Sequence, residues 1–131
     1  MAFKIIQQDF DSFTALPDHI WRTDKDKVQI PRKFNSVLIG DHWVAYAYDT
    51  RQIIGFSECL AGAAFCDPPQ PVQLPGKAWF IKGRAYGEQP KAPVNVRHLK
   101  DMLGRRLFRN QTIIEISEPE FELLRKYSLS Q

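Results

Sequence analysis

The sequence predicts an α+β domain, a small mixed sheet or barrel with short helices at its ends. Segments rich in Val, Ile and aromatic residues alternate with turn residues along most of the 131 residues, which is typical of several short strands. Apolar residues at helical spacing occur in two stretches near the C-terminal end. With 44% apolar and 25% charged residues, the composition is that of an ordinary globular domain, so we expect residues 1–131 to form a single domain.

The first half of the chain is predicted to contain a strand, a short helix, a loop and a β-hairpin. Residues 2–8 (AFKIIQQ) favour a strand, and the polar residues after them favour a short helix that ends before Pro17. The charged segment RTDKDK after Trp21 has no apolar periodicity and is predicted to be an exposed loop. Within residues 36–59, two apolar runs flank DTRQ, which indicates a hairpin, and Gly40-Asp41 fits a tight turn before it.

Side chains in the first strand of this hairpin are expected to alternate between the two faces of the sheet. One face would carry His42, Val44, Tyr46 and Tyr48, and the other Trp43, Ala45 and Ala47. The interior of a barrel would produce this alternation of large rings and small alanines.

The second half is predicted to begin with an internal loop, because residues 67–76 contain four prolines. Residues 77–86 favour a strand, residues 96–103 have helical spacing, and Gly104 is a suitable stop. Residues 112–116 (TIIEI) favour a further strand.

A closing helix is predicted after Ser117, a suitable N-cap, with its inward face formed by Phe121 and Leu124 and extended by Leu123.

Several classes of protein are excluded or disfavoured. No signal peptide and no long apolar segment is found, so we expect a cytoplasmic protein without a membrane partner. Cys59 and Cys66 are too few for a disulfide scaffold or a zinc site, and we expect no metal and no cofactor. No phosphate-binding loop, serine-hydrolase elbow or zinc-protease motif occurs, so we expect the chain not to be an enzyme.

Positive charge is concentrated in one part of the chain. Between Lys77 and Arg109 the sequence holds nine Lys and Arg residues and only two acidic ones. If these side chains share a face, they would attract a polyanion. A solvated basic surface without a partner would show the same charge pattern, so charge alone leaves both interpretations open.

Aromatic residues are interleaved with this positive charge, as a nucleic-acid site requires, because bases stack on rings and phosphates pair with cations. The predicted base-binding or ligand-binding rings are Trp21, Tyr46, Tyr48, Trp79 and Phe80. The predicted phosphate-binding residues are Arg22, Lys77, Lys82, Arg84, Arg105 and Arg106. The alternative is that most of these rings belong to the core.

Four blocks of the sequence resemble EVE domains, members of the PUA-like superfamily related to YTH domains. They are FKIIQQDFDSF, WRTDKDKVQIPRKF, VLIGDHWVAYAYDTRQIIGFSEC and TIIEISEPEFELL, which follow one another in the family's order over nearly the whole chain. The resemblance implies a pseudo-barrel of about six mostly antiparallel strands with short flanking helices. It also implies a small aromatic pocket that receives a modified base turned out of its strand.

Carried over residue by residue, the resemblance makes Trp21 one wall of that pocket, Tyr46 or Tyr48 a second wall, and Arg109 a contact at its rim. The expected partner is DNA or RNA with a modified base, bound through an aromatic pocket with a basic rim, and an effector protein is a possible further partner. The oligomeric state stays open.

Two alternatives remain at this point: a PUA-like domain that binds a small nucleotide-like or anionic metabolite, and a hydrolase acting on such a ligand. The hydrolase would need a polar residue in the pocket, such as Asp49, Cys59 or His42.

Overall fold

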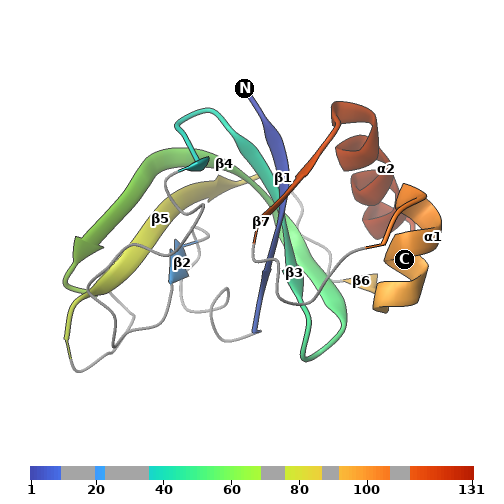
Figure 1. Cartoon of the computed structure of the whole chain (residues 1–131), viewed down its shortest axis with the longest axis horizontal. Helices are drawn as coiled ribbons and strands as arrows, with labels where there is room; N and C mark the ends of the chain where they lie inside the picture. Colours follow the sequence, from blue (N-terminus) through green and yellow to red (C-terminus); the bar gives the residue numbers. More distant parts are fainter. Residues whose placement is uncertain (10–19, 23–35, 69–75, 87–91, 107–112) are drawn as a thin grey trace.

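The computed structural model describes residues 1–9, 20–22, 36–68, 76–86, 92–106 and 113–131, with the backbone alone for residues 20–22. Within these ranges the chain forms one seven-stranded sheet and two helices, which lie together at one end of the sheet (Figure 1). The elements are β1 (Phe3–Gln8), β2 (Ile20–Arg22), β3 (His42–Ala47), β4 (Gln52–Cys66), β5 (Ala78–Ala85), β6 (Ala92–Pro93), α1 (Val96–Leu103), β7 (Ile113–Ile116) and α2 (Glu118–Leu129).

The strands follow the order β2-β5-β4-β3-β1-β7, and β6 pairs with the start of β4. Strands β1 and β3 are parallel, and the other pairs are antiparallel. The long strand β4 pairs first with β3 and then with β5, and its register shifts three times along the way. Such irregularities bend a strand and increase its twist. Together with β5, β4 therefore curves away from the central strands (Figure 1), which confirms the predicted α+β class.

Both faces of the central strands are buried. The face toward the helices packs into a helix-side core that includes Ile5, Val44, Tyr46, Ile53, Phe56, Leu99, Phe121 and Leu124. The opposite face packs into an inner core that includes Ile6, Trp43, Ala45, Ala47, Ile54, Cys59, Ile81 and Ile113. Since Ile81 on β5 and Ile113 on β7 come from distant strands of the sheet, the sheet wraps around this second core. The alternation predicted for β3 is confirmed.

The helix ends also agree with the sequence. At α1, the Asn95 side chain accepts a hydrogen bond from the His98 backbone N–H, and Gly104 ends the helix with φ of 68°. At α2, Ser117 and Glu120 form a reciprocal capping box. The predicted inward position of Leu123 is wrong, because this side chain is 43% exposed.

The hairpin, the turn at Gly40 and the strands near both ends of the sequence lie where they were predicted. The first residue of the predicted RTDKDK loop, Arg22, instead ends strand β2, because its backbone pairs with Phe80 on β5. The rest of that loop, the predicted short helix before Pro17 and most of the proline-rich segment fall outside the described residues. In the part of the chain that the structure describes, neither helix is long and apolar enough to cross a membrane.

Tyr46 connects the sheet to the segment that leads into α1. Its side chain is 0% exposed, and its hydroxyl donates a hydrogen bond of 2.8 Å to the Val94 carbonyl. Burial raises the pKa of Tyr46 to about 12. Close by, the Tyr127 hydroxyl of α2 donates a 2.7 Å bond to the Pro93 carbonyl from a more exposed position.

We expect Tyr46→Phe to lower the free energy of unfolding by about 1–2 kcal/mol, because it leaves the Val94 carbonyl unpaired in the core. The matched variant Tyr127→Phe should lose less than about 1 kcal/mol, because water can replace its hydroxyl. Denaturant unfolding followed by circular dichroism measures both losses. Equal losses of unfolding free energy would contradict the prediction that the buried hydrogen bond of Tyr46 contributes more to stability than the exposed one of Tyr127.

Candidate functional site

Polar residues form a row across three neighbouring strands on the inner face of the sheet. Lys4 on β1 pairs with Trp43 on β3, and Trp43 pairs with Ser57 on β4. Partners in register lie side by side on the same face, so these three side chains share the face of the inner core. Their exposed fractions are 3%, 1% and 0%. Three polar residues in succession are unusual at such depth.

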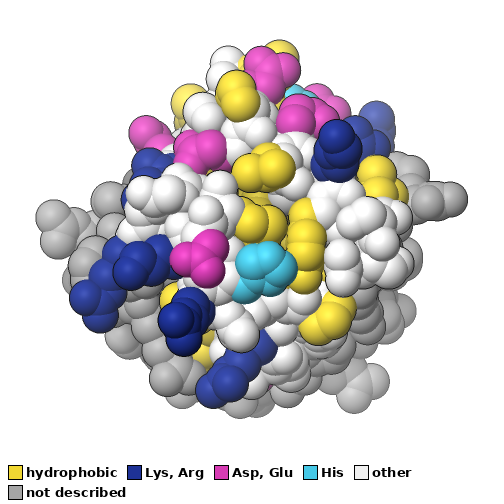
Figure 2. All heavy atoms as spheres, turned by 90° about the vertical axis from the view of Figure 1, so that its right-hand side faces the viewer, with side chains coloured by type: hydrophobic (Ala, Val, Ile, Leu, Met, Phe, Trp, Pro, Cys, Tyr) yellow, Lys and Arg dark blue, Asp and Glu magenta, His cyan; other side chains and the backbone are white. Residues whose placement is uncertain are grey.

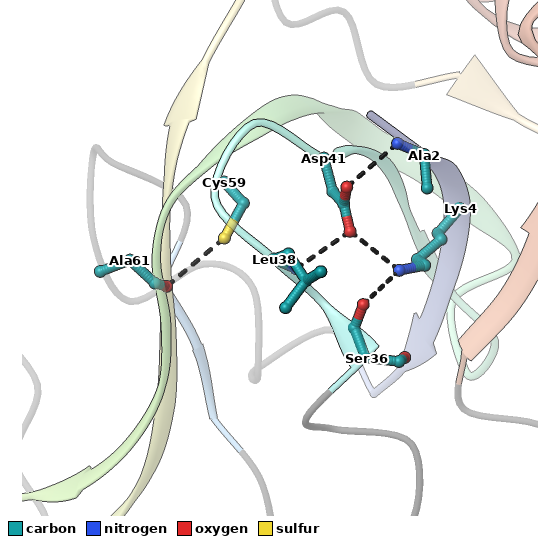
Figure 3. Close-up of polar contacts among 7 residues, drawn as sticks. All are labelled: Ala2, Lys4, Ser36, Leu38, Asp41, Cys59 and Ala61. Atoms are coloured by element: carbon teal, nitrogen blue, oxygen red, sulfur yellow. Dashed lines mark hydrogen bonds and ion pairs between the residues drawn. The ribbon is translucent and has the colours of Figure 1, made fainter.

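Lys4 and Asp41 form a buried ion pair at one end of this row (Figure 3). The Lys4 Nζ lies 2.9 Å from Asp41 Oδ2 and donates a second bond of 2.6 Å to the Ser36 carbonyl. Asp41 also accepts backbone hydrogen bonds from Leu38 at 2.9 Å and from Ala2 at 3.0 Å. Both charges are therefore compensated within the fold, and the pair anchors β1 to the turn before β3.

These contacts decide the ionisation of Asp41. Burial raises the pKa of its carboxyl group, but the hydrogen bonds from the Leu38 N–H, Lys4 and the Ala2 N–H together outweigh burial. The pKa of Asp41 therefore lies below its ordinary value of 3.8, and the carboxylate is charged at neutral pH.

Trp43 and Ser57 differ from this satisfied pair. The indole Nε1 and the Ser57 Oγ are buried and have no hydrogen-bond partner among the described residues. The third such atom in the described ranges, Nδ1 of His42, lies on the helix side, where the His42 ring stacks on Phe3 at 5.0 Å. Buried polar groups are nearly always paired in proteins, and an unpaired one costs about 1–3 kcal/mol.

Trp43 is one of the aromatic residues that the sequence interleaves with positive charge, but neither Trp43 nor Ser57 is among the residues predicted to bind a base. A usable signal was present for Trp43, because the period of two already placed it on the same face as Ala45 and Ala47, where small side chains surround a large polar ring. No comparable signal existed for Ser57, because its place opposite Trp43 depends on the pairing of two strands.

The structure corrects the prediction for Tyr46 and Phe80, which are core residues, and places Tyr48 on the helix side. Tyr46 is a core residue and not the wall of an open pocket, because its ring has no exposure and its hydroxyl is bound within the fold. Phe80 is 5% exposed and is buried as well. Tyr48 packs against the helix-side core, away from Trp43 and Ser57. Their large apolar rings contribute more to a small core than to a surface.

Trp79 is the predicted base-binding ring that the structure places beside the inner core. It is half-buried, and its ring centroid lies 5.5 Å from that of Phe65. The backbone of Trp21 in β2 pairs with Ile81, two residues along β5 from Trp79. The side chain of Trp21 and the whole of Arg109 lie outside the described residues.

The predicted phosphate-binding residues separate into two groups. Lys77, Lys82 and Arg84 are exposed along β5 or directly before it. Lys82 and Arg84 alternate with the buried Ile81 and therefore leave β5 on the face away from the inner core. The side chain of Arg22, on the neighbouring strand β2, lies outside the described residues.

Arg105 and Arg106 follow α1, which Figure 1 shows on the other side of the central strands from β5. The Arg105 guanidinium pairs with Glu120 at 3.2 Å and donates to the Glu115 carbonyl at 2.8 Å, so its charge is already compensated. Figure 2 shows that Lys and Arg side chains on the helix side lie at the lower left and again at the upper right, with acidic side chains next to both groups. The described Lys and Arg residues between Lys77 and Arg106 therefore do not all share one face.

The residues considered for a hydrolase do not come together. Cys59 lies on the inner face, where burial raises the pKa of its thiol to about 11, and its Sγ donates to the Ala61 carbonyl at 3.4 Å (Figure 3). The thiol is therefore protonated at neutral pH. His42 lies on the helix side, and Asp49 lies in the turn between β3 and β4. Among the described residues, no three His, Cys, Asp or Glu side chains are grouped to hold a metal ion.

No protein-family model matches the sequence, and no curated protein matches it significantly. Solved structures do match. A Pseudomonas putida protein has a TM-score of 0.64 at 13% identity, over 97% of this chain and 99% of that one. The Mmi1 YTH domain in complex with RNA has a TM-score of 0.61 at 11% identity, over 98% of this chain and 78% of that one.

A variant of the ASCH protein from Zymomonas mobilis gives a TM-score of 0.60 at 14% identity, over 96% of this chain and 98% of that one. These likenesses confirm the predicted PUA-like fold, which ASCH and YTH domains share. Membership of the EVE domains in particular stays a prediction.

We expect Asp41→Asn to lower the free energy of unfolding by about 3–5 kcal/mol at neutral pH, because it leaves the Lys4 ammonium buried without a counter-charge. The pKa of Asp41 is lower in the folded chain than in the unfolded chain, so its contribution is present above about pH 4 and is lost as the pH falls further. The variant should therefore lose less stability on acidification than the natural sequence does. Denaturant unfolding at several pH values measures this difference.

The control is Arg105→Ala, which removes an exposed ion pair and should change stability by less than about 1 kcal/mol. A similar loss in both variants would contradict the role given to the Lys4 and Asp41 pair.

Proposed function

We propose that the chain is a binding module for single-stranded nucleic acid that accepts one base, in particular a modified base, at the inner side of its barrel. RNA is favoured over DNA because the Mmi1 YTH domain, which has the same fold, was solved in complex with RNA. The proposal keeps the base-binding role predicted from the sequence, but moves it away from Tyr46, Tyr48 and Phe80.

The observation that carries this proposal is the composition of β5 and its surroundings. Trp79 lies half-buried at the inner core, Lys77 is exposed directly before β5, and Lys82 and Arg84 are exposed on the opposite, outer face of the same strand. Single-stranded nucleic acid is bound by this combination, in which bases stack on rings and cations pair with the backbone. The neighbouring strand β2 brings the backbone of Trp21 opposite Ile81. We infer that β2 and β5 together form the entrance for the base.

We also propose that the module binds without catalysis. A protonated Cys59 is a poor nucleophile, and His42 and Asp49 belong to other parts of the structure. Arg105 is paired with Glu120, which favours β5 over the end of α1 as the place of backbone contact.

Trp21→Ala is expected to abolish the preference for one base while the chain stays folded, since loss of one stacked ring weakens binding of a base by about 1–3 kcal/mol. Fluorescence anisotropy with labelled RNA oligonucleotides that differ in one modified base measures the preference, and the melting temperature reports on the fold. Unfolding of the variant would instead make this ring part of the core.

Lys82→Glu and Arg84→Glu are expected to weaken binding of all sequences alike and to reduce the salt dependence by about one unit of slope per contact. The matched control is Arg97→Glu, which makes the same charge change on the exposed side of α1 and should leave binding nearly unchanged. Equal effects in all three variants would show that only the net charge matters. Salt-independent binding of free nucleosides at the same affinity would favour a metabolite as the ligand.

A further inference from the structure

We propose that the Trp43 Nε1 and the Ser57 Oγ form the pair of groups that reads the hydrogen-bonding edge of the bound base. This inference rests on the proposed function and extends it from the entrance at β5 to the atoms that select the base. Its starting point is the fact that, of all buried side-chain nitrogen and oxygen atoms in the described residues, these are the two on the inner face that have no partner.

The two groups are placed to act on one ligand. Trp43 and Ser57 are directly paired in register on the antiparallel strands β3 and β4, so their side chains leave the sheet next to each other. Beside them on the same face lie the small side chains of Ala45 and Cys59, while the next residue across the sheet on β5 is Ala85. The side chains next to the pair along these strands are therefore small, and the larger Ile6, Ile54 and Ile81 of the same core are apolar, so none of these described residues offers the pair a polar partner.

The remaining polar neighbour in the row is already engaged. Lys4 donates to the Ser36 carbonyl at 2.6 Å and to Asp41 at 2.9 Å. Its ammonium therefore points to these two acceptors and makes no hydrogen bond to the Ser57 hydroxyl. By contrast Ser128, which is equally buried, donates its hydroxyl to the Leu124 carbonyl at 3.0 Å. Two equally buried serines thus differ: the Ser128 hydroxyl is hydrogen-bonded, whereas the Ser57 hydroxyl has no partner among the described residues.

The chemistry of the pair specifies the class of ligand edge. An indole N–H can only donate, whereas a serine hydroxyl can donate or accept. Together they fit a planar edge that offers a ring nitrogen or carbonyl oxygen to Trp43 and a second polar atom to Ser57, as the Watson–Crick edge of a nucleobase does. Because both atoms are closed to water in the free chain, the base reaches them only when the inner face opens, and the two new hydrogen bonds favour that open state.

Ser57→Ala tests this inference, because loss of the hydroxyl should affect the stability of the free protein and its affinity for the base differently. Removing an unpaired buried hydroxyl should leave the melting temperature of the free protein unchanged or raise it by up to about 3 °C. The same change should weaken binding of the preferred base about 5- to 10-fold, with little effect on the other bases. The probe is a short oligouridine that carries a single different central base, measured by fluorescence anisotropy.

Ser128→Ala is the matched control: it removes a buried hydroxyl that is paired, away from the inner face, and should leave the base preference unchanged. Trp43→Phe keeps a ring but removes the N–H, and it should reduce the same preference; if it fails to fold, Ser57→Ala alone decides. A lower melting temperature for Ser57→Ala together with an unchanged base preference would show that the hydroxyl is satisfied inside the fold, and would overturn the inference.

Binding by the natural sequence distinguishes a failure of the proposed function from a failure of this inference. If the natural sequence binds none of the oligonucleotides, both proposals are wrong. If it binds them and prefers one base, but Ser57→Ala shows the same ratio of affinities, only the assignment of Trp43 and Ser57 is wrong.

Discussion

The buried contact between Lys4 and Asp41 is the constraint on which the rest of the site depends. It joins the first strand to the turn that precedes β3, and thereby fixes the parallel register of β1 and β3. That register brings Lys4 beside Trp43 and, through β3, in line with Ser57. An ion pair in the interior adds little net stability compared with apolar residues, but it penalises every alternative pairing that would leave one charge alone.

Local features of the fold could be predicted from the sequence, whereas the site could only be predicted in part. The hairpin, Gly104 and the Ser117 cap depend on residues close in sequence, and their signals are correspondingly direct. Tyr46 was misassigned because a period of two separates the faces of a strand without telling which face the helices cover. The compensation of Arg105 by Glu120 is likewise a contact between distant elements, which spacing cannot show.

The two faces of the sheet differ in how their side chains are packed and paired. On the helix side, aromatic residues such as Phe56 and Phe121 pack edge to face and hold the two helices on the strands. On the inner side, Trp43 and Ser57 each bury a polar atom that has no partner among the described residues, beside alanine and isoleucine side chains, and each unpaired atom costs stability. Functional sites are commonly the places where a fold accepts such a disadvantage, because the ligand removes it.

The position of β1 between β3 and β7 also constrains how the chain acquires its structure. The first strand has one neighbour that begins at residue 42 and another that begins at residue 113, so its second edge stays unpaired until nearly all of the described sequence has been synthesised. Contacts between such distant segments form slowly, because a long loop must close before they can stabilise anything. During translation the nascent sheet therefore exposes an open strand edge, where chaperones or premature association can intervene before β7 covers it.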